Sequence, residues 1–333
     1  MRAVAFYEHG GPEVLMVVDG WPEPKPAENE VLVAIEACSL NHLDVFTRRG
    51  MPGVAVDLPR ITGGDIAGVV VEIGTQVSGI TAGDRVLIDP LITLPDGKQG
   101  ALGENANGGL TECIAVPASN LIRLPNTITF EHGAALPIAY GTAHRMVVSR
   151  GKIQPGETVV VVGASGGVGT ACVQLAAQVG AEVIAVASNQ AKLDRLATLG
   201  AAHLVLARGE EYGKAVWALT GKKGADVIVD YTGQATWPTT LRTIRKGGRI
   251  LVCGATSGHD ATTDLRYVWV REATIIGSDG WERSDLEALV ELVANGRMVP
   301  VIDRVVGFDG VRKAHEDLEN RRVFGKIVIS PRA

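Results

Sequence analysis

The chain has few cysteines and lacks the features that mark several large protein classes. Its 333 residues include four cysteines and no C-x-x-C pair, which argues against disulfides and a cysteine-rich zinc lobe and favours a reducing, cytoplasmic compartment. With 32 Lys and Arg against 37 Asp and Glu, nothing favours nucleic acid or an anionic membrane as a partner. No apolar run approaches the ~20 residues that span a bilayer, and the N-terminus lacks a signal-peptide core. We therefore expect a globular protein with a small-molecule substrate.

Glycine, by contrast, is abundant, and its placement in Thr158–Gly169, TVVVVGASGGVG, is the most informative feature. Four consecutive valines predict a strand buried on both faces. The chain then turns through Gly163, Gly166 and Gly169 into an amphipathic run that predicts a helix. Bare backbone N–H groups and the positive end of that helix would face an anion. The segment predicts a cradle for a dinucleotide pyrophosphate, although tight strand–helix turns need glycine even without a ligand.

Short apolar strands alternate with helical segments around this motif, which predicts a doubly wound parallel sheet. The strands beyond the first are expected at Glu182–Ala187, His203–Leu206, DVIVDYTG, RILVCG and ATIIGS. The helices are expected at Ala134–Ser149, Gln190–Leu199, Glu210–Thr220 and Ala235–Arg245.

The ends of the chain have a different pattern, which predicts a second domain. Short strand-like pieces separated by Gly- and Pro-rich turns are typical of an antiparallel, partly open barrel. They are Ala3–Phe6, Val31–Ala37, Ile66–Ile73, Arg85–Ile88 and Leu110–Val116. Helices Ser284–Asn295 and Val311–Asn320 and a strand Gly325–Ile329 follow the α/β segment, and we expect this tail to pack on the barrel. The expected domains are residues 1–130 with 281–333, and residues 131–280.

Several motifs together carry a resemblance to a known family. They are GGPEVL (Gly10–Leu15), NHLD (Asn41–Asp44), GGDIAGVVVEIG (Gly63–Gly74), GDRV (Gly83–Val86), GENANGGLTE (Gly103–Glu112), GASGGVG, KGGRILVCG (Lys246–Gly254) and FGKIV (Phe324–Val328). With them the chain resembles the medium-chain dehydrogenase/reductase superfamily, and within it the quinone oxidoreductases. The resemblance implies a GroES-like antiparallel β-barrel catalytic domain plus a doubly wound Rossmann domain, in a homodimer or homotetramer. It also implies that the strand near Ala273–Ser278 joins two subunits.

Zinc ligands of the family are missing, so we expect no bound zinc. The family's Gly-His-Glu triplet corresponds to Gly63-Gly64-Asp65, and Pro137–His144 has no cysteine for a later ligand. Asp89–Gly103 contains no cysteine for a structural zinc. Cys38 alone cannot hold Zn²⁺ and is better explained as a small buried hydrophobe. His42 and His144 remain open as replacement ligands, although isolated histidines are more often structural.

The expected cofactor is NADPH, with NADH as the alternative. An NAD site places Asp or Glu at the end of the second strand. Here strand Glu182–Ala187 is followed by Ser188, two amide residues and Lys192, which suit a 2′-phosphate. The resemblance implies a tyrosine after the third strand, where Ala207 stands instead, and Arg208 could substitute for it. Lys192 could equally be a solvated helix residue.

The resemblance implies that Asn41 and Asp44 line the site beside the nicotinamide. Asn41 could donate to a substrate oxygen, and Asp44 could orient the carboxamide or a water. The alternative is a loop held together by Asx hydrogen bonds. Tyr140 or Thr142 could deliver a proton, as could water, and Tyr140 could equally be a core aromatic.

The remaining cofactor contacts are also implied by the resemblance. They are Thr142 near the nicotinamide; Gly163, Gly166, Gly167 and Val168 at the pyrophosphate; Ser188 and Lys192 at the adenosine ribose; Gly233, Gly254, Ala255 and Thr256 after the fourth and fifth strands; and Lys326 near the C-terminus.

Three functions follow, in order of preference. The first is a zinc-independent NADPH-dependent reductase of quinones or α,β-unsaturated carbonyls, because hydride addition to a conjugated C=C bond needs only hydrogen bonds at a remote carbonyl oxygen. The second is an alcohol or aldehyde dehydrogenase of the same fold. The third is a catalytically silent nucleotide-binding protein.

Overall fold

The computed structural model describes every residue except 52, 95 and 208, and the side chains of residues 209 and 210 are also left undescribed. The chain divides into two compact units, Met1–Ile138 with Leu286–Ala333, and Ala139–Asp285. Both boundaries fall a few residues after those expected from the sequence. No helix among the described residues is long and apolar enough to cross a bilayer.

The first unit is built on a seven-stranded sheet. Its path runs β10-β6-β5-β3-β18-β17, and β9 also pairs with β3. The strands are β3 (Glu30–Ser39), β5 (Asp65–Ile73), β6 (Arg85–Ile88), β9 (Cys113–Pro117), β10 (Leu121–Arg123), β17 (Ile302–Val306) and β18 (Lys326–Ile329). A three-stranded sheet joins β2 (Met16–Val18), β1 (Ala3–Phe6) and β4 (Arg60–Ile61), and β7 (Leu91–Thr93) pairs with β8 (Gln99–Ala101).

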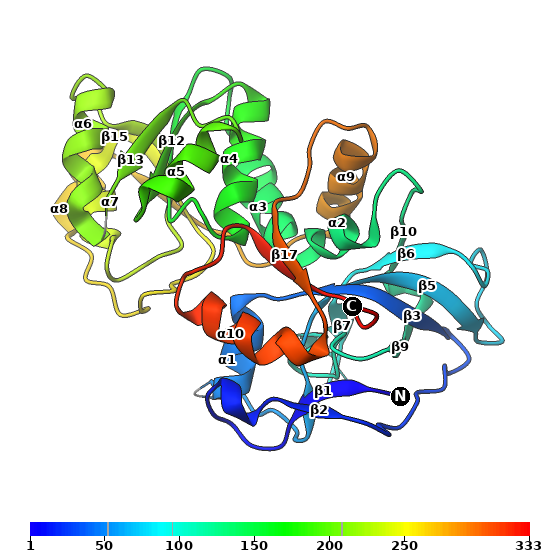
Figure 1. The fold of residues 1–333 in the computed structure, drawn as a ribbon. Coiled ribbons are helices and arrows are strands. Elements are labelled where there is room, and N and C mark those ends of the chain that lie inside the picture. The colour runs from blue at the N-terminus through cyan, green and yellow to red at the C-terminus, as the bar shows by residue number, and fades with distance from the viewer. Residues whose placement is uncertain (52, 95, 208) are drawn as a thin grey trace. The chain divides into compact units, whose positions relative to one another are not determined.

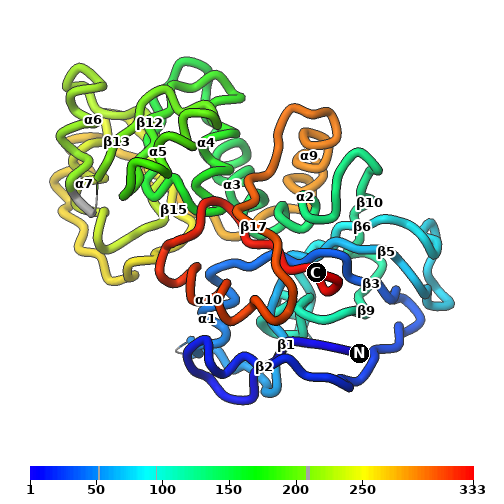
Figure 2. Tube along the Cα trace, in the orientation of Figure 1, coloured from blue at the N-terminus to red at the C-terminus, as the bar shows by residue number. Residues whose placement is uncertain are grey.

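The antiparallel strands predicted from the N-terminal sequence are confirmed, and the C-terminal tail completes their sheet. Strand β18 pairs antiparallel with β3 through Val328 opposite Ser39 and Ile329 opposite Cys38. Figure 2 shows this red C-terminal segment beside the blue N-terminal strands. The sequence did not predict β17, because Ile302–Val306 interrupts its apolar residues with Asp303 and Arg304.

Short helices cover this sheet unit. They are α1 (His42–Arg49), α2 (Phe130–Ala134), α9 (Arg283–Ala294), whose first turn falls in the other unit, and α10 (Val311–Glu319), with single turns η1 (Pro12–Val14), η2 (Ala118–Asn120) and η6 (Phe308–Gly310). Helix α1 packs against α10 (Figure 1). Arg48 on α1 is fully buried there and pairs with Glu319 on α10.

The second unit contains the predicted six-stranded parallel sheet, in the order β13-β12-β11-β14-β15-β16. Its strands are β11 (Thr158–Val162), β12 (Glu182–Ala187), β13 (His203–Leu206), β14 (Ala225–Val229), β15 (Ile244–Val252) and β16 (Thr274–Gly277). The order reverses between β11 and β14, which creates the crevice at the carboxyl ends of the strands where open α/β sheets bind ligands. The doubly wound fold is therefore confirmed.

Helices flank the sheet on both faces, as the burial of β11 at every position from Val159 to Val162 requires. Val160 packs in a core with Val216 and Leu241, from the helices that follow β13 and β14. Val159 and Val161 point to the other face and are equally buried. Helix α3 packs against α4, and α7 packs against α6 and α8 (Figure 1). The helices are α3 (Gly141–His144), α4 (Gly167–Val179), α5 (Gln190–Ala197), α6 (Gly213–Leu219), α7 (Trp237–Thr243) and α8 (Leu265–Arg271).

Some boundaries differ from expectation. Helix α7 ends at Thr243, and the strand β15 already begins at Ile244, where the sequence predicted helix up to Arg245. Gly247 and Gly248 lie inside that strand, which hid its first half from the pattern. Helix α8, Leu265–Arg271, was not among the helices expected from the sequence. The predicted helix Ala134–Ser149 is confirmed as a series of helical turns, with η3 (Leu136–Tyr140) and η4 (Arg145–Arg150) on either side of α3.

Candidate active site

The glycine turn between β11 and α4 has the geometry that a dinucleotide pyrophosphate requires. Gly163 has φ of +71°, a conformation that residues with a side chain rarely adopt. Gly166 is the N-cap residue of α4, and among the described residues no side chain caps that helix. A Cβ at Gly166 would meet nothing within 4 Å, so it would fill the open space in front of the helix. The residues present therefore fit a nicotinamide dinucleotide, whose pyrophosphate the first-turn N–H groups of Gly167 and Val168 would hold.

Gly169 allows close packing of α4 against Ala164 and Tyr231. A Cβ there would lie 2.5 Å from the Tyr231 hydroxyl oxygen and 2.6 Å from the Ala164 carbonyl carbon. The Tyr231 hydroxyl donates to the Gly163 carbonyl oxygen at 2.7 Å. Tyr231, which follows β14, therefore supports the glycine turn from behind. Sequence reasoning did not single out this residue.

The two loops that follow β14 and β15 are tied together at the same edge of the sheet. The Thr256 N–H donates to the Tyr231 carbonyl oxygen at 3.1 Å, and the Gln234 N–H donates to the Gly258 carbonyl oxygen at 3.0 Å. Gly233 is buried with φ of +85°, whereas Gly254, Ala255 and Thr256 are exposed. The structure thus places these predicted cofactor residues in one loop cluster.

A buried carboxylate holds the β14 loop in place. Asp230 is 0% exposed, and its Oδ1 accepts from the N–H groups of Thr232 at 2.9 Å and Gly233 at 3.3 Å. The hydroxyls of Thr236 and Thr240 donate to it at 2.9 and 2.5 Å. No basic side chain among the described residues pairs with it in the structure. Four donors therefore replace a counter-ion.

The end of β12 presents the residues expected at the adenosine ribose. Ser188 is exposed and Lys192 is half-buried. Asn189 caps α5, because its Oδ1 accepts from the Lys192 N–H at 3.1 Å. Arg208 lies outside the described residues.

In the first unit, Asn41 stands in a buried polar cluster that we call the amide cluster, formed by Ser39, Asn41, Asp65 and Lys326. The Lys326 ammonium donates to the Asn41 Oδ1 at 2.5 Å, to the Asp65 Oδ2 at 3.0 Å and to the Leu40 carbonyl oxygen at 2.8 Å. The Asn41 Nδ2 and the Ser39 hydroxyl each donate to the Asp65 Oδ2 at 2.8 Å. Lys326 is 2% and Asp65 0% exposed, whereas Asn41 keeps 8% exposure.

Asp44 joins the start of α1 to the segment before β5. Its Oδ2 accepts from the Asn41 N–H at 2.6 Å and its Oδ1 from the Gly63 N–H at 2.7 Å. This is the stitched-loop arrangement that the sequence left open beside the catalytic one. Burial raises the pKa of Asp44 to about 6, although the hydrogen bonds from both backbone N–H groups lower it.

This raised pKa predicts a pH dependence of stability. A pKa of about 6 in the folded state, against 3.8 as the ordinary value, means that the folded protein binds more protons than the unfolded one between these pH values. The contribution of Asp44 to the free energy of unfolding therefore falls by about 3 kcal/mol as the pH rises from about 4 to about 7. We expect the unfolding free energy of the protein, measured in urea, to fall by this amount relative to that of Asp44→Asn between these pH values. Exposed Asp309→Asn is the control, and a protein that gains stability relative to Asp44→Asn as the pH rises would contradict the prediction.

Tyr140 and Thr142 belong to the second unit and are both buried. The Tyr140 hydroxyl donates to the Gln174 Oε1 on α4 at 2.9 Å. This contact favours the core explanation of Tyr140 over proton delivery. Thr142 lies on α3 and keeps 9% exposure.

The residues do not fit the zinc that the family's best-known members bind. Among the described residues, no three His, Cys, Asp or Glu side chains form a group that could hold a metal ion. Cys38 is fully buried beside Gly63, and burial raises the pKa of its thiol. The His144 Nδ1 donates to the Asp285 Oδ1 at 2.7 Å, and burial lowers the pKa of His42 to about 4.

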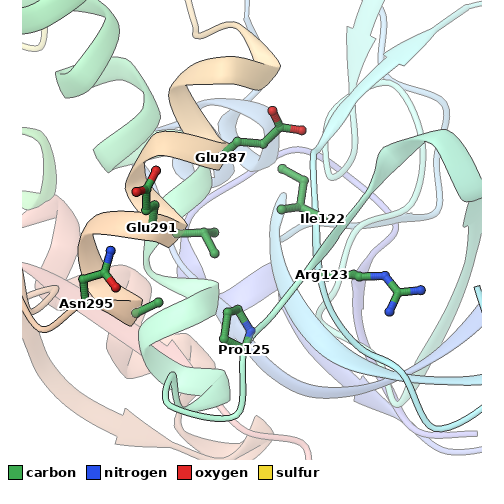
Figure 3. Close-up of a pocket in the computed structure, with 8 residues that line it drawn as sticks. Ile122, Arg123, Pro125, Glu287, Glu291 and Asn295 are labelled. Atoms are coloured by element: carbon green, nitrogen blue, oxygen red, sulfur yellow. The ribbon is translucent and has the colours of Figure 1, made fainter.

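A surface groove lies elsewhere in the first unit, between β10 and α9. Its volume is about 400 Å³, and its lining residues are Ile122, Arg123, Pro125, Glu287, Val290, Glu291, Ala294 and Asn295. Figure 3 shows Glu287, Glu291 and Asn295 along the helix, opposite Ile122 and Arg123. None of the predicted site residues lines this groove.

Three of the residues that organise these sites were not predicted in their present roles, yet each left a signal. Asp65 stands at the start of β5, directly before the apolar run Ile66–Val71, Lys326 is the single charge of β18, and Asp230 directly follows β14. A charge beside buried positions needs a partner. The sequence could raise that question, but it could not say which charges pair.

Comparisons with known proteins agree with this architecture. Residues 27–126 match the alcohol dehydrogenase GroES-like domain, and residues 167–295 match the zinc-binding dehydrogenase family. The quinone oxidoreductase-like protein 2 homolog of Nematostella vectensis is 31% identical over 340 residues, which cover 99% of this chain and 88% of that protein.

Solved structures are similar over the whole chain. An NAD-dependent alcohol dehydrogenase has a TM-score of 0.93 at 37% identity, with 99% of each chain covered. The 2-octenoyl-CoA carboxylase reductase CinF, in complex with NADP and 2-octenoyl-CoA, has a TM-score of 0.89 at 27% identity, covering 99% of this chain and 87% of that one. The chain therefore belongs to the medium-chain dehydrogenase/reductase superfamily. It is an NAD(P)H-dependent oxidoreductase of that superfamily.

Proposed function

We propose that this enzyme is an NADPH-dependent reductase of quinones or α,β-unsaturated carbonyl compounds that works without zinc. The observation that carries the proposal is the amide cluster. In it, the Asn41 amide is held between Asp65, which corresponds to the glutamate of the family's Gly-His-Glu triplet, and Lys326. An amide N–H suits a developing oxyanion, as an oxyanion hole does. The likeness to a reductase in complex with NADP and an enoyl thioester supports the same chemistry.

In this proposal the residues of the chain bind the cofactor, orient the Asn41 amide and stabilise the charge that develops on the substrate oxygen. The reduced nicotinamide, when bound, supplies a hydride to the β-carbon of the conjugated C=C bond. The electron pair of that bond moves towards the carbonyl oxygen, to which Asn41 donates its N–H. Water then protonates the α-carbon, because the Tyr140 hydroxyl is buried and bonded to Gln174. Asp44 positions Asn41 by accepting its backbone N–H.

The reaction is tested by following NADPH oxidation in stopped flow against quinones, enones, enoyl thioesters, aldehydes and alcohols. We expect turnover with quinones or enones, unchanged after dialysis against a chelator. With NADPH deuterated at C4, the label should appear at the β-carbon of the product. Stoichiometric zinc needed for turnover of alcohols or aldehydes would reverse the proposal.

An alcohol or aldehyde dehydrogenase is the second candidate, favoured by the 37% identity to an alcohol dehydrogenase. A silent nucleotide-binding protein is the third. It would bind NADPH tightly and oxidise it with no member of the panel.

For the cofactor, we propose NADPH over NADH, because no carboxylate follows β12 and Lys192 is near its end. Lys192→Glu should weaken NADPH binding by roughly 30- to 100-fold, since an attraction to the 2′-phosphate becomes a repulsion. NADH affinity should change less than about threefold, because NADH lacks that phosphate. Fluorescence titration measures both dissociation constants.

Lys214→Glu, on the exposed face of α6, is the matched control for a change of charge. Equal losses for both nucleotides in Lys192→Glu would show that Lys192 does not recognise the phosphate.

We also propose a homodimer formed through β16, with a homotetramer as the alternative. Strand β16 is an edge of the sheet, and an edge strand offers unpaired backbone groups to a second copy. Large apolar side chains are exposed on it and on α8: Leu265, Trp269, Val270 and Ile275. Burying such a patch between two copies removes it from water. The four free cysteines support a reducing, cytoplasmic location.

Trp269→Glu should convert this dimer into a monomer, because a charge would be buried at the centre of the apolar patch. Sedimentation velocity at micromolar concentration measures the change. Leu206→Glu, on the opposite edge strand β13, should leave the assembly intact. A wild-type protein that is already monomeric would refute the proposal.

A further inference from the structure

The charged partners in the amide cluster fix the orientation of the Asn41 side-chain amide. An ammonium can only donate and a carboxylate can only accept hydrogen bonds. The Asn41 oxygen must therefore face Lys326 and its nitrogen must face Asp65, as the distances of 2.5 and 2.8 Å have it. Turning the amide over would place N–H against ammonium and oxygen against carboxylate.

This arrangement accounts for one of the two Asn41 Nδ2 protons and leaves the other. Asp65 takes the first, and among the described residues no acceptor takes the second. Asn41 is also the one member of the Asn41–Asp65–Lys326 set with appreciable exposure, at 8%. The cluster therefore leaves one N–H without an acceptor among the described residues, on the one residue of this set that is not closed off from the surface.

Lys326 is fully occupied in this role. Its three acceptors, the Leu40 carbonyl, the Asn41 Oδ1 and the Asp65 Oδ2, use all three ammonium protons. At 2% exposure, the ammonium has neither a proton nor open surface for a cofactor phosphate. This differs from the sequence-based expectation that Lys326 contacts the cofactor.

We propose that Lys326 and Asp65 are positioning residues: they lock the Asn41 amide so that its remaining N–H donates to the substrate carbonyl oxygen, and Lys326 makes that N–H a stronger donor. An ammonium bonded to an amide oxygen draws electron density from the amide nitrogen, and hydrogen bonds in such a chain strengthen one another. The proposal rests on the proposed function for the identity of the acceptor. Because Asp65 neutralises Lys326, the cluster can hold a buried cation next to the Asn41 amide without a net charge.

The test is a double-mutant cycle between the charge pair and Asn41. Lys326→Met with Asp65→Asn removes both charges together, which avoids leaving one of them buried alone. With the best quinone or enone substrate, we expect kcat to fall roughly 10- to 100-fold and the dissociation constant of NADPH to stay within about twofold. In an Asn41→Ala background the same pair of substitutions should change kcat less than about threefold.

Two controls accompany the cycle. Arg304→Met with Asp317→Asn removes another ion pair of the same unit, with N–O distance 2.7 Å, and should leave kcat within about threefold. Thermal melting shows that each variant is folded. An undiminished kcat in the double variant, an equal loss in the Asn41→Ala background, or a large loss of NADPH affinity would each overturn the proposal.

A measurement without substrate separates this proposal from the proposed function. In ¹⁵N-labelled, deuterated protein, the side-chain amide signals of Asn41 are those that disappear in Asn41→Ala. We expect one Nδ2 proton to exchange with water at least tenfold more slowly than the other, and the difference to vanish in the Lys326→Met, Asp65→Asn variant. Equal exchange in the wild type would overturn the proposal that Lys326 and Asp65 fix the Asn41 amide, even if the enzyme reduces enones. Unequal exchange would support that proposal even if no acceptor is reduced, in which case the proposed function alone would fail.

Discussion

Replacing Gly166 with aspartate should abolish NADPH binding while leaving the fold slightly more stable. Gly166 is the N-cap of α4 in extended backbone, with φ of −81°, and a Cβ there meets nothing within 4 Å. An aspartate would fit, accept from the first-turn N–H groups and raise the unfolding free energy by a few tenths of a kcal/mol. It would also occupy those N–H groups and repel the pyrophosphate. We expect NADPH affinity to fall by about 100-fold or more, measured by fluorescence titration.

Gly166→Ala separates the effect of charge from that of size. It should lower affinity far less, because it adds a methyl group without a carboxylate. Unchanged NADPH affinity in Gly166→Asp would show that the pyrophosphate does not lie at this helix end.

The second large effect is expected at Asp230. Its carboxylate accepts from two backbone N–H groups and two threonine hydroxyls in a fully buried site. Asp230→Leu would leave all four donors without an acceptor, and each buried donor without a partner costs about 1 kcal/mol or more. We expect the unfolding free energy to fall by about 3–5 kcal/mol, measured by urea unfolding.

Graded variants locate the cause. Thr240→Val, which removes one donor to Asp230, should cost only about 1–2 kcal/mol. If Asp230→Leu cost no more than Thr240→Val, the carboxylate would not be the centre of the network.

The sheet of the second unit could be predicted from the sequence because buried parallel strands have a strong local pattern. Val159–Val162 are apolar at every position, and the pattern ends where Gly163 turns the chain. The strand His203–Leu206 was predicted to the residue. Strand β17 was missed because Asp303 and Arg304 break its pattern, and what makes it a strand is its pairing with β18.

The candidate site was predicted less completely. Gly163, Gly166 and Asn41 could be named because their roles follow from local geometry or from the resemblance. Tyr140, by contrast, could be a proton donor or a core residue until Gln174 was found beside it. Lys326 was expected to contact the cofactor, because a single lysine in a strand carries no information about its acceptors.

The sequence by itself determined the family, the doubly wound sheet and the glycine turn, since backbone conformation and apolar periodicity are properties of neighbouring residues. Only the tertiary structure decided which buried charges meet. Asp65 and Lys326 are 261 residues apart in the chain and come together because β5 and β18 both pair with β3, shortly before Asn41. Such pairing follows from long-range strand register, and local pattern does not encode it.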